Sequence, residues 1–184
     1  MANVRKHKEN LIRTAMRLFR RQGYASTGLQ QILAESGAPK GSLYHYFPGG
    51  KESLGEAAVV LAGGLIAEML ADLAAKHPGD AKAFVLGYCE VMAGWMEESG
   101  FQSGCPIATT LLETAPQSPA ITRVGSDVLD SWIDTIASVF SKSGIAPGPA
   151  RERAQFLIAA MEGALILARV RRSPRPILDV AAFF

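Results

Sequence analysis

Cysteines are few in this chain, and their arrangement excludes two common ways of stabilising a small protein. Cys89 and Cys105 are the two cysteines, with no CxxC pair and no pair of histidines nearby. This spacing predicts neither a zinc site nor a disulfide framework. We therefore expect no metal ion and no other cofactor.

Long apolar runs and a secretory leader are missing as well. The longest apolar candidate, residues 57–67, is rich in Ala and Gly and is followed by Glu68, so it falls short of the ~18 residues that span a bilayer. The N-terminal basic residues Arg5, Lys6 and Lys8 are not followed by the apolar core of a signal peptide. We expect a cytoplasmic protein with no membrane partner.

Strand patterns and catalytic motifs are also absent from the sequence. No alternating β-branched run is bounded by turn residues, which favours an all-α protein. The GxSxG, HExxH and Walker spacings do not occur, and no nucleophile stands beside a base. The sequence predicts a protein that is not an enzyme. An enzyme and a purely protein-binding helical module remain the competing classes.

What the chain does have is an uneven distribution of charge. Residues 1–56 hold nine Lys and Arg against four Asp and Glu, a net charge of +5. Residues 57–184 hold ten against thirteen, a net charge of −3. A basic N-terminal third on a slightly acidic body predicts that this third meets a polyanion. The alternative is a solvated helix face with no partner.

Three short helices are expected in the first 50 residues. Apolar residues at helical spacing cover 4–22, and Gly23 ends that helix. A second helix is expected at 28–35 with Thr27 as its cap, broken by Gly37. We expect Pro39 to begin a third helix. A short helix, a glycine-containing turn and another short helix form a helix-turn-helix unit, so residues 1–50 are expected to be a DNA-binding domain.

The second helix of such a unit places its N-terminal end in the DNA major groove. Here that end carries Lys40, Gly41 and Ser42. The start of the preceding helix, at Thr27 and Gly28, can offer a hydroxyl and backbone amides to a phosphate. The partner expected from these residues is double-stranded DNA.

Residues 14–54, "TAMRLFRRQGYASTGLQQILAESGAPKGSLYHYFPGGKESL", resemble the DNA-binding domain of TetR/AcrR-type transcriptional repressors. The end of this stretch, "GGKESL" (residues 49–54), and a further segment, "GCPIATTLLE" (residues 104–113), are similar to the LmrA/YxaF-like branch. The resemblance implies a ligand-responsive repressor. Such a protein is released from its palindromic operator when a small lipophilic or aromatic effector binds.

The resemblance also implies a role for each matching residue of the expected DNA-binding domain, residues 1–50, which we call the head. Tyr44 and His45 would project from the recognition helix onto the DNA backbone or a base edge, and Thr27 and Lys51 would clamp phosphates on either side. The alternatives are a half-buried aromatic at Tyr44, a solvated surface residue at His45 and a spectator surface charge at Lys40 and Lys51. The complete set of expected DNA-binding residues is Thr27, Gly28, Lys40, Gly41, Ser42, Tyr44, His45 and Lys51.

Residues 51–184 read as longer helices and are expected to form an effector-binding and dimerisation domain. The breaks at proline and glycine predict helices over 51–76, 80–98, 106–115, 119–142 and 150–172. The helix that begins at Lys51 would join the two domains.

A helix-turn-helix protein usually dimerises, because one short helix reads few base pairs and two must lie ~34 Å apart on a palindrome. We expect a homodimer in which the last two long helices pair with their copies as a four-helix bundle. Apolar residues surround most of the final helix, and some of them must be ordinary core. The candidate interface residues are Phe156, Leu157, Ala160, Gly163, Ala164 and Leu167.

Methionine and aromatic side chains at helical spacing fill the middle of the chain. Such residues form either plain core or the lining of an apolar cavity, and the resemblance implies a cavity here for a small-molecule effector. Polar anchors for it could come from Glu90, Thr109, Thr110 and Glu113. The candidate lining residues are Met69, Phe84, Tyr88, Met92, Trp95, Met96, Ile107, Leu111 and Trp132.

Overall fold

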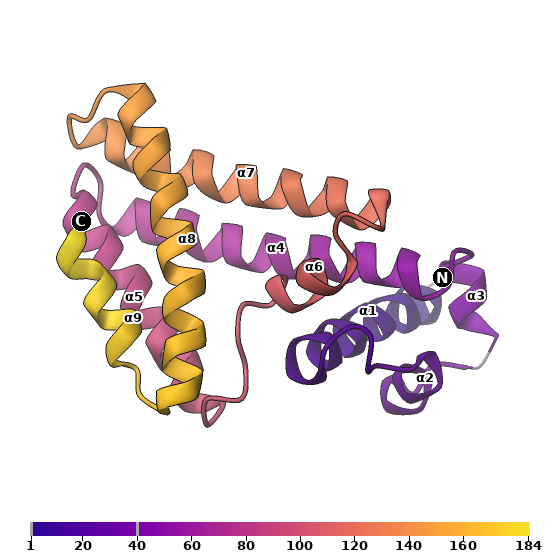
Figure 1. Cartoon of the computed structure of the whole chain (residues 1–184). Coiled ribbons are helices and arrows are strands. Elements are labelled where there is room, and N and C mark those ends of the chain that lie inside the picture. Colours follow the sequence, from indigo (N-terminus) through magenta and orange to yellow (C-terminus); the bar gives the residue numbers. More distant parts are fainter. Residues whose placement is uncertain (1, 40) are drawn as a thin grey trace. The chain divides into compact units, whose positions relative to one another are not determined.

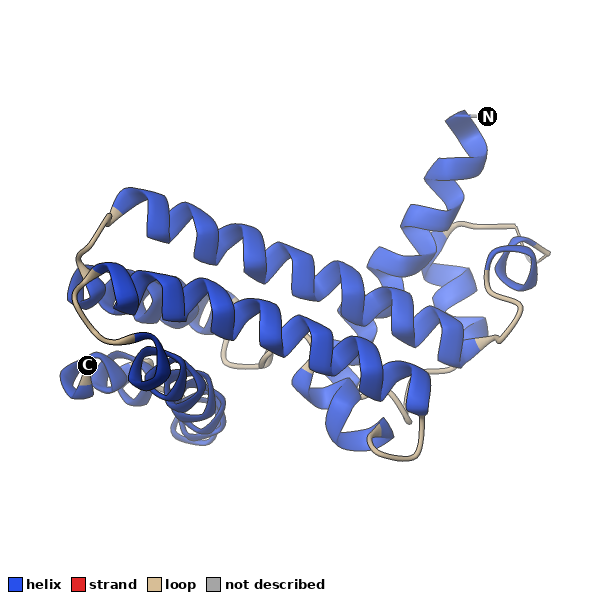
Figure 2. Cartoon of the chain, turned by 90° about the horizontal axis from the view of Figure 1, so that it is seen from above, coloured by secondary structure: helices blue, strands red, loops and turns tan. Residues whose placement is uncertain are grey.

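The protein is all-helical, as expected. The computed structural model describes residues 2–39 and 41–184, with side chains from Lys6 onward. These residues form nine α-helices and one 3-10 helix, joined by loops and turns, with no strand among them (Figures 1 and 2). The predicted DNA-binding residue Lys40 lies outside the described residues.

The chain divides into two compact units. Unit 1 comprises Met1–Gly64 and Pro106–Val128, and unit 2 comprises Leu65–Cys105 and Leu129–Phe184. The units differ from the expected division at residue 50, because the start of α4 (Lys51–Lys76), all of α6 (Ala108–Thr114) and the start of α7 (Pro119–Lys142) belong with the N-terminal helices. Two helices, α4 and α7, therefore run from one unit into the other.

Unit 1 contains the three helices expected at the N-terminus. They are α1 (Ala2–Gln22), α2 (Leu29–Ser36) and α3 (Ser42–Tyr46). Gly23 follows α1 with φ +92° and Gly37 follows α2 with φ +65°. Both angles lie in the left-handed region, where a residue without Cβ is favoured. The two helix ends predicted from these glycines are confirmed.

Two expected helix starts in unit 1 are wrong. Pro39 does not begin the third helix: its carbonyl accepts hydrogen bonds from the Ser42 amide at 2.9 Å and the Ser42 hydroxyl at 2.6 Å, which closes a turn before α3. Thr27 does not cap α2, because Gly28 is the N-cap residue. The Thr27 side chain is buried instead, and its hydroxyl donates to the Gly23 carbonyl at 2.6 Å.

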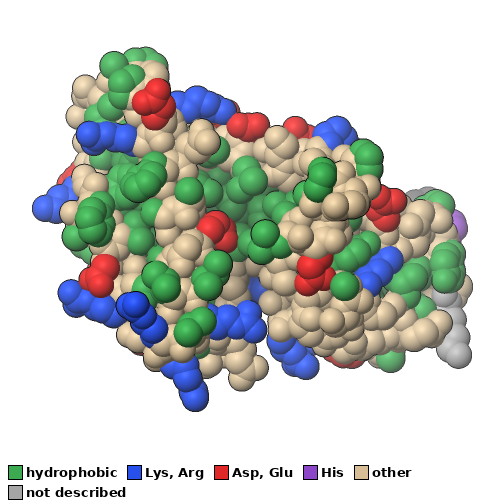
Figure 3. All heavy atoms as spheres, in the orientation of Figure 1, with side chains coloured by type: hydrophobic (Ala, Val, Ile, Leu, Met, Phe, Trp, Pro, Cys, Tyr) green, Lys and Arg blue, Asp and Glu red, His purple; other side chains and the backbone are tan. Residues whose placement is uncertain are grey.

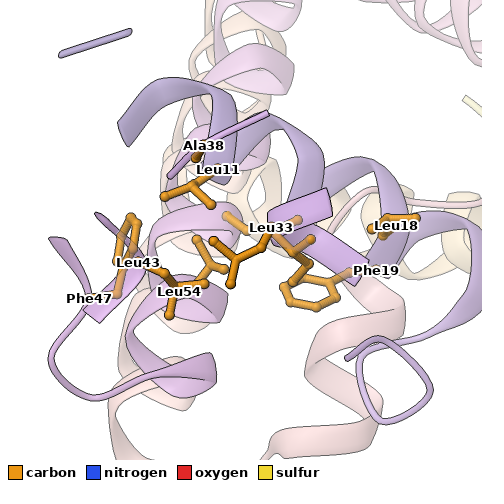
Figure 4. Packing of buried hydrophobic residues seen from close by; sticks show 11 residues of the cluster. Leu11, Leu18, Phe19, Leu33, Ala38, Leu43, Phe47 and Leu54 are labelled. Carbon is orange, nitrogen blue, oxygen red and sulfur yellow. The ribbon is translucent and has the colours of Figure 1, made fainter. Parts of the chain in front are cut away.

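The core of unit 1 holds the head together. Apolar side chains from α1, α2, α3 and the start of α4 meet in one cluster (Figure 4). Burying a large aliphatic or aromatic side chain contributes about 1.5–3 kcal/mol relative to leaving it exposed, so these contacts fix how the short helices α2 and α3 sit on α1. The labelled members are Leu11, Leu18, Phe19, Leu33, Ala38, Leu43, Phe47 and Leu54.

Unit 2 is built around α5 (Ala81–Glu98) and α8 (Pro147–Arg171), together with the later parts of α4 and α7. The expected start of α8 at residue 150 is wrong, because Pro147 already occupies its first turn, where proline loses no helical hydrogen bond. The apolar tail is also helical. It forms α9 (Arg175–Val180) and a 3-10 helix (Ala181–Phe183), and α9 packs against α5 and α8 (Figure 1).

Helix α4 is long and apolar enough to cross a membrane by length and composition. In its most apolar 18-residue window, 39% of the residues are buried within the protein. Leu54 and Leu70 on this helix are fully buried. A core helix of a soluble protein meets the same criteria, so a single such helix is weak evidence for a membrane span.

Candidate functional site

Helix α3 and the residue that follows it have one buried side and one exposed side. Leu43 is fully buried and Phe47 nearly so, whereas the Tyr44 side chain is 60% exposed. His45 is also exposed, and its ring contacts the edge of Tyr46 with the ring centroids 5.0 Å apart. The helix is thus held from below by apolar contacts while two side chains with hydrogen-bonding groups face outward.

The residues before α3 form the turn at its N-terminal end. Gly41 is exposed, and a Cβ at this position would meet no atom within 4 Å. Ser42 is half-buried, and its hydroxyl is engaged by the Pro39 carbonyl. A role for these two residues at DNA stays a prediction. The open space above Gly41 is compatible with close approach of another molecule.

The start of α2 offers backbone rather than side-chain groups. Gly28 is exposed, has an extended backbone with φ −85° and ψ 146°, and makes no side-chain capping hydrogen bond. Amides in the first turn of a helix have no partner within the helix. Thr27 is fully buried, so its side chain presents no surface to a phosphate, and its predicted contact has no support in this geometry.

Lys51 lies against the turn between α1 and α2. Its Nζ donates a hydrogen bond to the Ala25 carbonyl at 3.3 Å and lies 4.5 Å from the centroid of the Tyr24 ring. Burial lowers the pKa of Lys51, and the nearby carboxylate of Glu113 opposes that shift. The ammonium group thus already has partners within unit 1. Its contact with a DNA phosphate stays a prediction.

Glu113 reaches the same turn from α6. Its Oε2 accepts a hydrogen bond from the Ala25 amide at 2.5 Å. The sequence suggested Glu113 as an anchor for an effector, whereas in the structure this carboxylate binds the turn between α1 and α2. Two residues 88 positions apart in the sequence meet here, and no local pattern signals such a contact.

Part of the positive charge of the head is neutralised internally. Arg13 pairs with Glu9 at 2.8 Å along α1, and Arg17 on α1 pairs with Glu35 on α2 at 2.7 Å. The hydrogen bond from Arg17 holds the pKa of Glu35 below its usual value. The basic excess of the N-terminal third therefore includes arginines that stabilise its own helices.

The predicted effector-lining residues are divided between the two units. Seven of the nine lie in unit 2, and Ile107 and Leu111 lie in unit 1. In unit 1, the Leu111 side chain covers Gly125, where an added Cβ would clash with it. In unit 2, Met69 and Trp95 are half-buried. The buried members there are Phe84, Tyr88, Met92, Met96 and Trp132.

A polar cluster lies around the buried Tyr88 in unit 2 and includes the half-buried Glu162. Burial raises the pKa of Tyr88 well above its usual value, and Cys105, Glu162 and Cys89 add to this shift. Burial also raises the pKa of Glu162, against a hydrogen bond with the Cys105 side chain. The pKa of Cys89 rises to about 11, chiefly through burial. Sequence reasoning identified Tyr88 but missed Glu162, whose position among apolar residues of α8 was the available signal.

A surface groove of about 650 Å³ lies in unit 2 beside the ends of α4 and α7. Its lining includes Ala71, His77, Asp134 and Lys142. None of the nine predicted effector residues lines it. The groove therefore does not coincide with the expected effector site.

Helix α8 has one buried and one exposed apolar face. Leu157 and Ala164 from the predicted interface are buried within their own unit, so helical position assigns them to the core. Phe156, Gly163 and Leu167 are exposed, and Ala160 is half-buried. Ile166 and Val170 are also exposed and extend the same face. Ile166 is one of the apolar residues that surround this helix in the sequence, whereas Val170 was missed. Figure 3 shows hydrophobic side chains over the surface where α8 lies in Figure 1.

The solvent-facing side of α7 has a different character. Its exposed residues in the unit 2 part include Asp130, Ser131, Asp134 and Ser138. Asp130 and Asp134 both pair with Arg151 of α8. A polar face of this kind does not suit an apolar contact between subunits, in contrast to the exposed face of α8.

Comparison with known families matches two segments of the chain. Residues 11–58 match the bacterial regulatory proteins of the tetR family. Residues 81–183 match the C-terminal domain of LmrA/YxaF-like transcriptional regulators. The second match alone covers more than half of the chain.

Individual relatives align over nearly the whole length. The chain is 33% identical to the HTH-type transcriptional regulator YxaF of Bacillus subtilis over 174 residues, which are 95% of this chain and 91% of that one. It is 30% identical to LmrA of the same organism, over 95% and 93% of the two chains. A crystal structure of a TetR transcriptional regulator from Chloroflexus aurantiacus superposes with a TM-score of 0.83 at 27% identity, covering 100% and 94% of the chains.

Proposed function

The chain belongs to the LmrA/YxaF-like branch of the TetR family of transcriptional regulators, and we propose that it is a cytoplasmic repressor. It binds a palindromic operator as a homodimer. A small lipophilic effector releases it from that DNA. Family membership confirms that the chain is a regulator and not an enzyme. The observation that carries the proposal is the exposed pair Tyr44 and His45 on α3, beside the fully buried Leu43.

The proposed DNA contacts start from the exposed groups of α2 and α3. The phenol of Tyr44 and the imidazole of His45 can hydrogen-bond phosphates or base edges. Gly41 leaves room for the DNA backbone, and the amides that follow Gly28 can bind a phosphate at the start of α2. The sequence resemblance adds a DNA contact by the cation of Lys40. Thr27 is left out of the contacts because it is buried.

The proposed dimer uses the exposed apolar face of α8. From Phe156 to Val170 this face extends about 21 Å along the helix, and its large side chains are exposed in the single chain. An apolar surface of this kind is stabilised by a partner surface. A second copy of α8 supplies an identical one across a twofold axis. Gly163 near the middle of the face lets two helices approach closely.

The proposed effector site is the interior of unit 2 around α5. Aromatic and thioether side chains there suit a lipophilic molecule. Among the described residues, the carboxyl group of Glu162 has no ion-pair partner, and it lies beside Tyr88 and Cys105. These polar groups favour an effector with at least one basic or hydrogen-bonding group on an apolar skeleton.

Release of DNA requires that the effector bind one conformation more tightly than the other. Its differential affinity sets the largest possible change in DNA affinity. Helix α4 begins at Lys51 in unit 1 and continues into unit 2. We propose that a displacement of this helix changes the separation of the two α3 helices in the dimer.

The DNA part is tested by selecting a duplex from a random-sequence pool with the wild-type protein. Affinity for the selected duplex and for a scrambled duplex is then measured by fluorescence anisotropy over a range of salt concentrations. We expect affinity to fall linearly on logarithmic axes with salt, and the selected duplex to bind at least ~1,000-fold more tightly than the scrambled one. Equal affinity for both duplexes at every salt concentration would contradict the proposal.

The effector part is tested by thermal-shift screening of lipophilic aromatic amines and phenols. A compound that raises the melting temperature should also lower the affinity for the selected duplex. A library in which stabilising compounds leave DNA affinity unchanged would contradict effector-controlled release while leaving DNA binding intact.

A further inference from the structure

The turn between α1 and α2, residues 23–25, is held from both sides by side chains distant in the sequence. The Ala25 amide donates to Glu113 Oε2 at 2.5 Å. The Ala25 carbonyl accepts from Lys51 Nζ at 3.3 Å. Both backbone groups of one turn residue are thus bound by charged side chains, one from α6 and one from α4. All of these residues belong to unit 1.

Both the backbone angle of Gly23 and its lack of a side chain are required for this arrangement. Its φ of +92° disfavours any residue with a Cβ. A Cβ added here would also lie 2.5 Å from Glu113 Oε1, closer than two such atoms can approach. The Glu113 carboxylate therefore occupies the space that a side chain at Gly23 would fill. One of its oxygens lies next to Gly23 and the other accepts the hydrogen bond from Ala25.

Tyr24 completes the arrangement between the two charged residues. Its ring lies 5.0 Å from the Phe19 ring and 4.5 Å from Lys51 Nζ. It also packs against Gly55 of α4, where an added Cβ would come within 2.8 Å of the ring. Burial and the charge of Glu52 raise the pKa of Tyr24. The turn is therefore anchored to the core of unit 1 by its aromatic side chain.

We propose that Glu113 is a positioning residue for DNA recognition, acting through the turn at Gly23–Ala25. The turn leads directly into Gly28 and α2, so its position sets where the first helix of the DNA-reading unit begins. Hydrogen bonds to a carboxylate are about twice as strong as those between neutral groups, which suits a single contact that fixes an exposed turn. This inference rests on the proposed DNA-binding function.

The test compares Glu113→Ala and Glu113→Gln with Asp127→Ala and Asp127→Asn. Asp127 is an exposed carboxylate of unit 1 that pairs with Arg123 along its own helix at 3.7 Å, so its variants match the charge changes. The duplex selected by the wild-type protein is the probe. Loss of a hydrogen bond to a charged group predicts about tenfold weaker binding for Glu113→Ala. Glu113→Gln keeps an acceptor oxygen and should bind about threefold more weakly than wild type.

Hydrogen exchange at the Ala25 amide gives a second readout, which a general loss of stability would not reproduce. We expect exchange at Ala25 to be at least ~10-fold faster in Glu113→Ala, intermediate in Glu113→Gln, and unchanged in both Asp127 variants. Exchange at buried core amides such as that of Leu18 should stay the same. If Glu113→Ala does not fold, Glu113→Gln against Asp127→Asn decides the question.

The inference is overturned if Glu113→Ala binds the selected duplex within about twofold of wild type, since the bond would then have no part in positioning. It is also overturned if exchange at Ala25 does not change, or if Glu113→Gln restores none of the binding. Failure of the proposed function looks different. In that case the wild-type protein itself would select no sequence from the pool.

Discussion

Helices α3 and α8 both expose large apolar or aromatic side chains, but in different ways. On α3 the exposed ring of Tyr44 stands beside the exposed His45 in the middle of a five-residue helix. On α8 the exposed side chains repeat along about four turns, from Phe156 to Val170. The first surface is small and carries hydrogen-bonding groups, whereas the second is continuous and apolar.

The difference indicates two kinds of partner. A short tip with a phenol and an imidazole suits a polar, charged surface such as the edge of a DNA groove, where geometry and hydrogen bonds give specificity. A long apolar stripe suits an equally apolar surface, where burial supplies most of the free energy. We therefore infer that α8 assembles the dimer and that α3 reads the DNA sequence.

The largest effect is expected from placing charges on the exposed apolar face of α8, which should weaken the dimer. In Ile166→Lys/Val170→Lys, four lysines per dimer would enter the contact, two from each chain. Since burying one such aliphatic side chain contributes about 1.5–3 kcal/mol, we expect the dimer dissociation constant to rise at least ~100-fold. Analytical ultracentrifugation measures this constant.

The matched control places the same charges on the polar face of α7, as Ser131→Lys/Ser138→Lys. Both serines are exposed, and this variant should dimerise like wild type. An α8 variant that dimerises as well as wild type would show that the exposed stripe covers some other surface.

Breaking the polar side should change DNA binding without changing assembly. Tyr44→Ala removes the exposed ring and hydroxyl of α3, and we expect about 10–100-fold weaker binding to the selected duplex, because a base or phosphate contact of this kind contributes about 1–3 kcal/mol. Tyr44→Phe tests the hydroxyl alone. Dimerisation by ultracentrifugation should be unchanged in both variants. Wild-type affinity in Tyr44→Ala would contradict the role proposed for α3.

The two units also differ in how they shift the pKa of a glutamate: that of Glu162 is raised and that of Glu35 is lowered. The stability that each residue contributes should therefore depend on pH in opposite ways. Burial raises the pKa of Glu162 on α8, so the folded state binds this proton more tightly than the unfolded state. Stability is then lost as pH rises from the ordinary pKa of glutamate through the raised one. Glu162→Gln should melt at a higher temperature than wild type at pH 7, with the difference shrinking toward pH 4.

Glu35 is the control with the opposite sign. The hydrogen bond from Arg17 lowers its pKa, so its contribution to stability is present at neutral pH and is lost as pH falls through the lowered pKa. Glu35→Gln should melt slightly lower than wild type at pH 7. A lower melting temperature for Glu162→Gln at pH 7 would show that the carboxylate is stabilised by contacts beyond its hydrogen bond with Cys105.

The smallest effect is expected at the start of α8, where Arg151 pairs with Asp130 at 2.8 Å and with Asp134. All three side chains are exposed, so Arg151→Ala should cost about 0.2–1 kcal/mol in urea unfolding. The cost should vanish near 1 M salt because exposed pairs are screened. A larger, salt-independent loss would indicate that Arg151 also supports the apolar contact of α8.

Much of unit 1 could be predicted because its signals are local. Gly23 and Gly37 end helices through their own backbone angles, and the alternation of Leu43 and Phe47 with Tyr44 and His45 follows from helical spacing. The contacts of Thr27, Lys51 and Glu113 were not predictable in this way. They depend on which distant segments meet at the turn, which periodicity does not encode.

Unit 2 was less predictable because its helices are apolar on more than one side. The sequence of α8 offers apolar residues around its circumference, so Leu157 and Phe156 look equivalent until the neighbouring helices are in place. The structure buries Leu157 and exposes Phe156. Glu162 was missed for a related reason: it stands among apolar residues of α8, but that position is equally compatible with a side chain that faces solvent.

The symmetry of the selected DNA site tests the proposed function most directly. The duplexes selected by the wild-type protein are sequenced, and the number of chains bound to each is measured by analytical ultracentrifugation. We expect an inverted repeat with half-site centres ~34 Å apart, bound by chains in pairs and bound more weakly when either half is scrambled. A site without an inverted repeat, bound with equal affinity by a single chain, would contradict dimeric recognition of a palindrome.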